Sequence, residues 1–305
     1  SRKQTPQSAP TPPPVTQDWL LSLGAWLVTA LAFFAPFIGG PGGPAWFFEP
    51  MFDTTLRRLV LFGVGGLLLT LMVFGWARDR KVTWRAHWLD LPVALFFLGL
   101  IISAARSPYP HLAFFGPLWN QIALPFVGTG LLLYLGVKHF ARTPREIERI
   151  AAALVLAGGI VAVIGLFDRV NPHGMAAAFH PPRLASILRN PMFTGLYLVM
   201  LVPLGVGVAL ATARRWLRWT MLLCAGLLAV AMVLTLSRSA WVGFAAAVLL
   251  LAPAIAWRYR GSLPRPVKLG AVAAVAALIV LALLLPPVRD RLHSMANLRD
   301  ATVQS

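Results

Sequence analysis

The sequence has few acidic residues. Only 10 of its 305 residues are Asp or Glu, against 27 Lys or Arg, and the formal net charge is +17. From Arg169 to Arg289 it contains no Asp or Glu at all. Such a basic balance in a soluble protein would suggest nucleic acid. This chain has no separate basic domain with interleaved aromatic residues, so we expect no nucleic-acid partner.

Charge of either sign is also scarce. Charged residues make up 12% of the chain and hydrophobic residues 58%, and the mean hydropathy is +0.73. So few charges could not cover the apolar surface of a soluble domain. The composition therefore predicts an all-α, polytopic membrane protein.

Cysteine is nearly absent. The single cysteine, Cys224, lies inside an apolar run, which excludes an intrachain disulfide and makes a cysteine metal site untenable. The glycine-rich stretch at 39–44, GGPGGP, lacks the lysine of a phosphate-binding loop. The sequence indicates no cofactor and no metal.

Long apolar runs are what the chain has in abundance. A spanning helix needs about 20 mostly apolar residues, and this criterion predicts about nine spans within a transmembrane domain at 19–285. They lie near 19–38, 59–76, 89–104, 122–137, 150–167, 193–211, 217–236, 240–257 and 268–285. The first run has no cleavage signal after it, so we expect a retained helix and not a signal peptide.

The two ends of the sequence differ from the apolar domain. Residues 1–18 are rich in Pro, Ser, Thr and Gln and predict a disordered tail. Residues 286–305 predict the start of a loop that continues beyond Ser305. Because the sequence begins with Ser1 and not Met, we expect its start to be missing or processed. Because it stops about twenty residues into this loop, we expect it to be the N-terminal part of a longer protein.

The basic residues predict an orientation. With a cytoplasmic N-terminus and alternating spans, the inner segments hold most of the 27 Lys and Arg residues, as the positive-inside rule requires. Cations on this side can meet anionic membrane lipids. The outer arginines oppose the rule, which makes them the unusual ones.

Three outer arginines are candidates for binding an anion. Arg183, Arg189 and Arg238 have few carboxylates on their side of the membrane, and an arginine within a membrane bundle needs an anion or water as partner. The planar guanidinium suits phosphate oxygens. The alternative is that each one anchors a helix end by reaching the lipid headgroups.

Two segments carrying these arginines resemble a known family. The segment PPRLASILRNPMFTGLYLVMLVPL (181–204) and the turn LTLSRSAWVGF (234–244) are similar, in order and separation, to the signatures of bacterial O-antigen ligases, O-antigen polymerases and related oligosaccharyl transferases. The run Asn190-Pro191-Met192 departs from the Asn-Pro-Asn run usual in that family.

The resemblance implies an activity. Members transfer a glycan from undecaprenyl pyrophosphate to a hydroxyl of lipid A core, another glycan or a protein, at the periplasmic face of the bacterial inner membrane. It implies pyrophosphate binding by Arg183 and Arg238, with Asn190 in support and Arg189 as a further candidate. No metal is required, and the sequence offers no Asp-x-Asp motif.

The resemblance also leaves a catalytic base to be found. Relatives use a histidine in a large periplasmic loop, which here would lie beyond Ser305. His293 is too close to the preceding span to match, and His173 and His180 fit ordinary loop residues better than acceptor-binding ones. Two other functions stay open: a transporter of a small anion such as bicarbonate, and a noncatalytic membrane subunit.

Overall fold

The computed structural model describes residues 19–38, 50–84, 86–115, 124–170, 183–188 and 190–258. Every regular element within these ranges is a helix. In chain order they are α1 (Trp19–Phe34), η1 (Ala35–Phe37), α2 (Pro50–Asp79), α3 (Asp90–Ala105), α4 (Pro110–Phe115), α5 (Leu124–Phe140), α6 (Pro144–Val170), η2 (Ser186–Leu188), α7 (Pro191–Ala211), α8 (Arg215–Leu234) and α9 (Arg238–Arg258).

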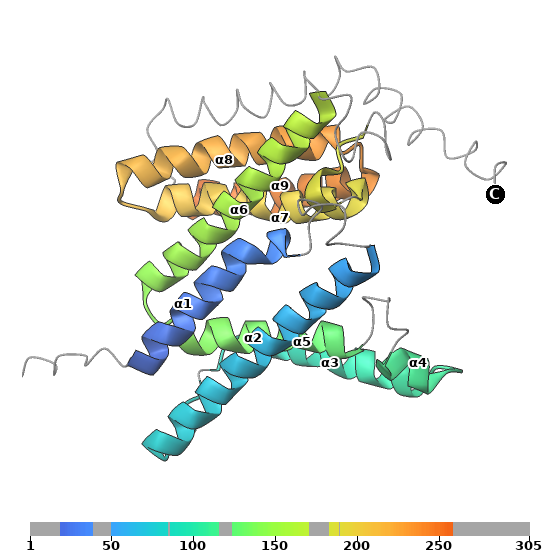
Figure 1. Ribbon diagram of the computed structural model, residues 1–305. Helices are drawn as coiled ribbons and strands as arrows, with labels where there is room; N and C mark the ends of the chain where they lie inside the picture. Colours follow the sequence, from blue (N-terminus) through green and yellow to red (C-terminus); the bar gives the residue numbers. More distant parts are fainter. Residues whose placement is uncertain are drawn as a thin grey trace, which may run out of the picture.

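The helices pack around two apolar clusters. One joins α6, α7 and α8 with the start of α9, and the other joins α1, α2 and α5. Figure 1 shows α7, α8 and α9 on one side and α2, α3 and α5 on the other, with α1 and α6 between them. The contact between α1 and α6 therefore connects the two clusters.

Glycines allow the close helix contacts within both clusters. A side chain at Gly158 of α6 would overlap Leu201 of α7, and one at Gly24 of α1 would overlap the buried ring of Phe140. Small residues let helix backbones approach in this way where no hydrophobic effect drives association within lipid.

Within the described residues, five helices are long and apolar enough to cross a membrane. They are the helical segments Trp19–Phe37, Val60–Asp79, Pro144–Val170, Pro191–Ala211 and Arg215–Leu234. These match the first, second, fifth, sixth and seventh expected spans. The third and eighth correspond to shorter apolar helices, Asp90–Ala105 and Arg238–Leu249, and the fourth to the 17-residue helix α5. The ninth, at 268–285, lies outside the described residues.

Large apolar side chains cover the outside of these helices. Phe167 of α6 is 71% exposed, Met200 of α7 64% and Leu223 of α8 66%. In water, such a surface would be a strong liability for aggregation, whereas hydrocarbon is its natural solvent. The exposed side chains and the five long apolar helices together support a helical membrane protein.

Contacts between helix ends set the relative direction of the helices. At one end, Arg149 near the start of α6 bonds to Thr29 of α1, Glu148 meets Thr212 just after α7, and Lys138 near the end of α5 meets Asp90 at the start of α3. We call this the basic end. At the opposite end, which we call the motif end, α6 and α8 finish and α7 and α9 begin. In this arrangement α6 and α8 run in one direction and α7 and α9 in the other. The count of about nine spans and the cytoplasmic location of the N-terminus stay predictions.

Candidate functional site: two arginine segments at the end of α8

The turn from α8 to α9 contains the second arginine segment. After α8 ends at Leu234, Leu236 adopts a φ of 53°, which reverses the chain sharply. Thr235 and Ser237 are buried, and the hydroxyls of Ser237 and Ser239 lie 3.0 Å apart. Arg238 is exposed at the first position of α9. The buried polar residues hold the turn, and the arginine side chain points away from the core.

The first arginine segment is attached directly to this turn. The backbone N–H of Leu184 donates to the Leu234 carbonyl at 3.0 Å, and Arg183 Nε donates to the Thr235 carbonyl at 3.2 Å. Arg183 thus bonds to a residue only three positions before Arg238. Two segments about 50 residues apart in sequence are therefore in contact at the motif end, and a joint binding site for Arg183 and Arg238 stays a prediction.

Buried hydroxyl groups fix the segment between Arg183 and α7. Ser186 has a φ of 52°, and its hydroxyl donates to the Val161 carbonyl of α6 at 2.7 Å. Thr194 on the first turn of α7 donates to the Ala185 carbonyl. Both side chains are buried, so these bonds satisfy polar groups that would otherwise be costly within the bundle. The segment is held in place by α6 and α7 together.

Asn190 has a definite structural role. Its side-chain oxygen accepts hydrogen bonds from the backbone N–H groups of Met192 at 2.8 Å and Phe193 at 3.5 Å. Pro191 occupies the first position of the helix, where it suits an N-terminus. Asn190 is therefore the N-cap of α7. The Asn-Pro pair starts the helix, and support for a pyrophosphate by Asn190 stays a prediction.

Arg169 is a third guanidinium at this site. Its Nη1 donates to the Leu234 carbonyl at 3.2 Å. The sequence placed it among the outer arginines but gave no reason to select it. The reason lies in the fold: the last carbonyls of α8 lack helical partners and carry the negative end of the helix dipole, which attracts cations.

The other predicted residues are placed as follows. Arg189, His173, His180 and His293 lie outside the described residues. Among the described residues, no three His, Cys, Asp or Glu side chains are grouped as metal ligands. A metal-independent reaction stays a prediction.

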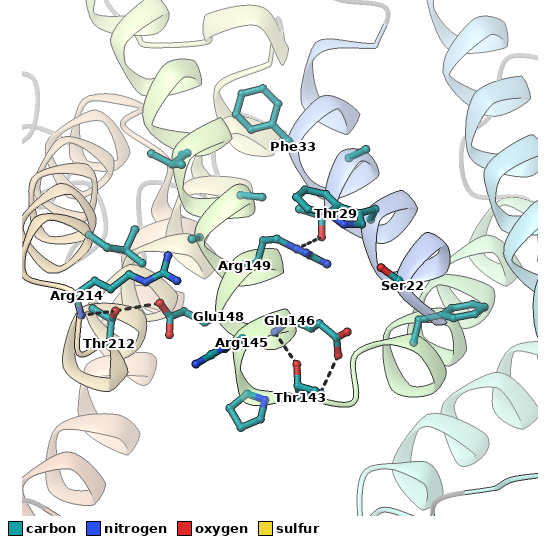
Figure 2. Close-up of a pocket in the computed structure, with 18 of the residues that line it drawn as sticks. Ser22, Thr29, Phe33, Thr143, Arg145, Glu146, Glu148, Arg149, Thr212 and Arg214 are labelled. Carbon is teal, nitrogen blue, oxygen red and sulfur yellow. Dashed lines mark hydrogen bonds between the residues drawn. The ribbon is translucent and has the colours of Figure 1, made fainter. Parts of the chain in front are cut away.

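A large cavity lies at the basic end, away from the arginine segments. Its volume is about 1680 Å³, and α1, the start of α6 and the turn between α7 and α8 line it. Figure 2 shows Arg149 reaching across it toward Thr29, with Glu148 and Thr212 on the far wall. Sequence reasoning did not foresee this cavity, because it depends on how α1, α6 and the turn between α7 and α8 pack together.

Comparison with known protein families, curated proteins and solved structures gave no match. The resemblance to the O-antigen ligases and polymerases therefore depends on the two quoted segments alone. The described part of the chain thus defines a class: a helical protein with five helices long and apolar enough to span a membrane and two arginine segments in contact at one end of the bundle.

Proposed function

We propose that the chain belongs to an enzyme that transfers a glycan from undecaprenyl pyrophosphate to a hydroxyl of an acceptor lipid, glycan or protein, at the periplasmic face of a bacterial inner membrane. The observation that carries the proposal is the contact between the two arginine segments. Arg183 bonds to the Thr235 carbonyl, three residues before Arg238. Arg169 bonds to the neighbouring Leu234 carbonyl.

The local charges suit a diphosphate. The negative end of α8 would repel an anion, but Arg183, Arg169 and the Leu184 N–H donate to its terminal carbonyls. The N-terminal, positive ends of α7 and α9 lie at the same place. A guanidinium has five N–H donors, and Arg169 donates through its Nη1 to the Leu234 carbonyl.

The transfer step explains why cations are needed. The bond between the anomeric carbon and the diphosphate oxygen breaks, the diphosphate leaves with the bonding electrons, and the acceptor oxygen forms the new bond. The negative charge that grows on the diphosphate is stabilised by prearranged donors. The acceptor proton passes to a general base.

The test is glycan transfer by the full-length protein. Wild type, Arg238→Gln, Arg238→Lys and Arg183→Gln are compared with an undecaprenyl-pyrophosphate glycan and candidate acceptors. Because each arginine is proposed to meet the departing charge, each Gln variant should lose about 10²–10³-fold in rate. Lysine keeps the charge but loses the planar fork, so Arg238→Lys should fall between wild type and Arg238→Gln.

The matched control is Arg215→Gln, which alters an exposed arginine at the opposite end of the bundle. It should transfer at the wild-type rate. Normal transfer by both Arg183→Gln and Arg238→Gln would make these residues helix-end anchors. Absence of transfer by wild type with every acceptor would instead favour the anion transporter or the noncatalytic subunit.

A further inference from the structure

The cavity at the basic end has a polar part and an apolar part. Its volume of about 1680 Å³ exceeds the roughly 300–1,000 Å³ typical of small-molecule sites. The polar part is formed by the α5–α6 connection, the first turns of α6 and the α7–α8 turn, and the apolar part by α1 and the next turns of α6. A molecule that fills the cavity should therefore also have one polar and one apolar part.

The polar part has an excess of cations. Arg142, Arg145, Arg149 and Arg214 line it, against Glu146 and Glu148. Both carboxylates already accept hydrogen bonds from other groups of the protein. Glu146 accepts hydrogen bonds from the backbone N–H groups of Arg142 and Thr143, at 2.9 and 2.8 Å, and Glu148 accepts one from Thr212 at 3.0 Å. Four guanidiniums against two carboxylates give this part of the cavity a net positive charge, which an anion would complement.

Two of the arginines have donors directed to solvent or a ligand. The guanidinium groups of Arg145 and Arg214 donate to no other residue in the described part of the chain, and both side chains are exposed. Arg149 is held differently. It stacks on Trp26 at 3.8 Å and its Nε bonds to Thr29 at 3.2 Å, which fixes it across the cavity (Figure 2). One fixed and two adaptable guanidiniums suit a phosphate group.

The apolar part has the depth of one membrane leaflet. It follows α1 from Leu21 to Phe34, which at the helical rise corresponds to about 20 Å. Half of a hydrocarbon core of about 30 Å is about 15 Å. Trp26, Ala30 and Phe33 on α1 face Ala152, Ala153 and Leu156 on α6 across this part of the cavity.

We propose that the cavity binds one phospholipid with an anionic headgroup, its phosphate among Arg145, Arg149 and Arg214 and its acyl chains along α1 and α6. The positive charge of the polar part favours an anionic headgroup. The apolar part, which is about as deep as one membrane leaflet, favours a lipid over a free anion. The site is separate from the proposed transfer site and does not depend on it.

Native mass spectrometry of the full-length protein in a neutral detergent tests this proposal. The protein is titrated with phosphatidylglycerol and with phosphatidylcholine of the same acyl chains. Wild type should bind phosphatidylglycerol about tenfold more tightly, and Arg145→Gln/Arg214→Gln should remove that preference, because charge-assisted bonds to the headgroup are lost. Ala30→Trp, which fills the apolar part, should weaken the binding of both lipids.

The matched control is Arg215→Gln, which changes the exposed neighbour of Arg214 that does not line the cavity. It should keep the preference. An equal loss in this control, equal binding of the two lipids by wild type, or full lipid binding by Ala30→Trp would overturn the proposal. Displacement of phosphatidylglycerol by inorganic phosphate would do the same, since it would identify a site for a free anion. A thermal melt confirms that each variant is folded.

Discussion

At Gly195 there is no room for a side chain between α7 and the turn before α9. An added Cβ would lie 2.8 Å from Ala240 Cβ and 2.9 Å from Thr235 Oγ1. Both contacts involve short, buried side chains, which cannot move aside as the end of a long chain could. The packing of this glycine sets the position of the Ser237-Arg238-Ser239 turn.

Gly195→Ala should therefore lower stability and transfer together. Overpacking of this kind costs about 1–3 kcal/mol, and the shifted turn would displace Arg238. The measurement is the thermal melting temperature in detergent alongside the transfer rate. Gly207→Ala on the same helix is the control, since nothing lies within 4 Å of its added Cβ. It should be neutral or slightly stabilising, and equal effects of the two substitutions would contradict the packing argument.

Two substitutions at Asn190 can distinguish its role as the N-cap of α7 from a role in ligand binding. Asn190→Ala should destabilise the protein by about 1 kcal/mol, because the cap bonds to Met192 and Phe193 are lost. Asn190→Asp retains a capping oxygen but places a negative charge near the proposed diphosphate. We expect near-normal stability and a reduced transfer rate for Asn190→Asp. Wild-type transfer by Asn190→Asp would restrict this residue to the cap.

Between helices, a polar cluster joins α3 to α5 at the basic end. Lys138 Nζ lies 2.6 Å from Asp90 Oδ2, Tyr134 donates to Asp90 Oδ1 at 2.7 Å, and the Lys138 ammonium lies 4.1 Å above the Trp84 ring. The side chains of Lys138 and Asp90 are 14% and 24% exposed. Removing one partner of such a pair leaves the other charge uncompensated.

Asp90→Asn should thus lower the melting temperature, and adding Lys138→Met should restore part of the loss, because the unpaired cation is removed. The control is Asp79→Asn, which breaks an exposed pair with the adjacent Arg78. Exposed pairs contribute little, so this variant should melt like wild type. A similar melting temperature for Asp90→Asn and wild type would show that α3 does not depend on the cluster.

Hydropathy alone predicts apolar centres well and helix ends poorly. The expected span at 150–167 lies inside α6, Pro144–Val170. The helix begins earlier because Thr143 and Glu146 form a capping box: each side chain accepts from the other's backbone N–H. The sequence Thr-Pro-Arg-Glu at 143–146 has the residue spacing of this capping box. The contact of Arg169 with α8, by contrast, depends on tertiary packing and left no local signature.

At the scale of the whole molecule, the positive-inside rule predicts which side of the membrane the basic end and the motif end of the helix bundle face. Cysteine labelling tests this directly, since the only native cysteine, Cys224, is buried. Ser239→Cys at the motif end and Arg215→Cys at the basic end both replace exposed residues. In intact cells whose outer membrane is permeabilised, an impermeant maleimide should label Ser239→Cys at once, but Arg215→Cys only after the inner membrane is opened. The reverse pattern would invert the topology.

The two arginine segments could be selected from sequence because they carry cations where carboxylates are absent. Their convergence could not be predicted, since it depends on tertiary contacts. Ser186 bonds to α6, Thr194 of α7 bonds to Ala185, and Leu184 bonds to the end of α8. The central claim of the account is that Arg183 and Arg238 serve one diphosphate.

A double-mutant cycle on undecaprenyl pyrophosphate affinity tests that claim most directly. Dissociation constants are measured for the full-length wild type, Arg183→Gln, Arg238→Gln and the double variant. Two residues that hold one diphosphate should be coupled, so the double loss should fall short of the sum of the single losses by at least about 0.5 kcal/mol. Additive losses, or wild-type affinity in either single variant, would contradict a joint site.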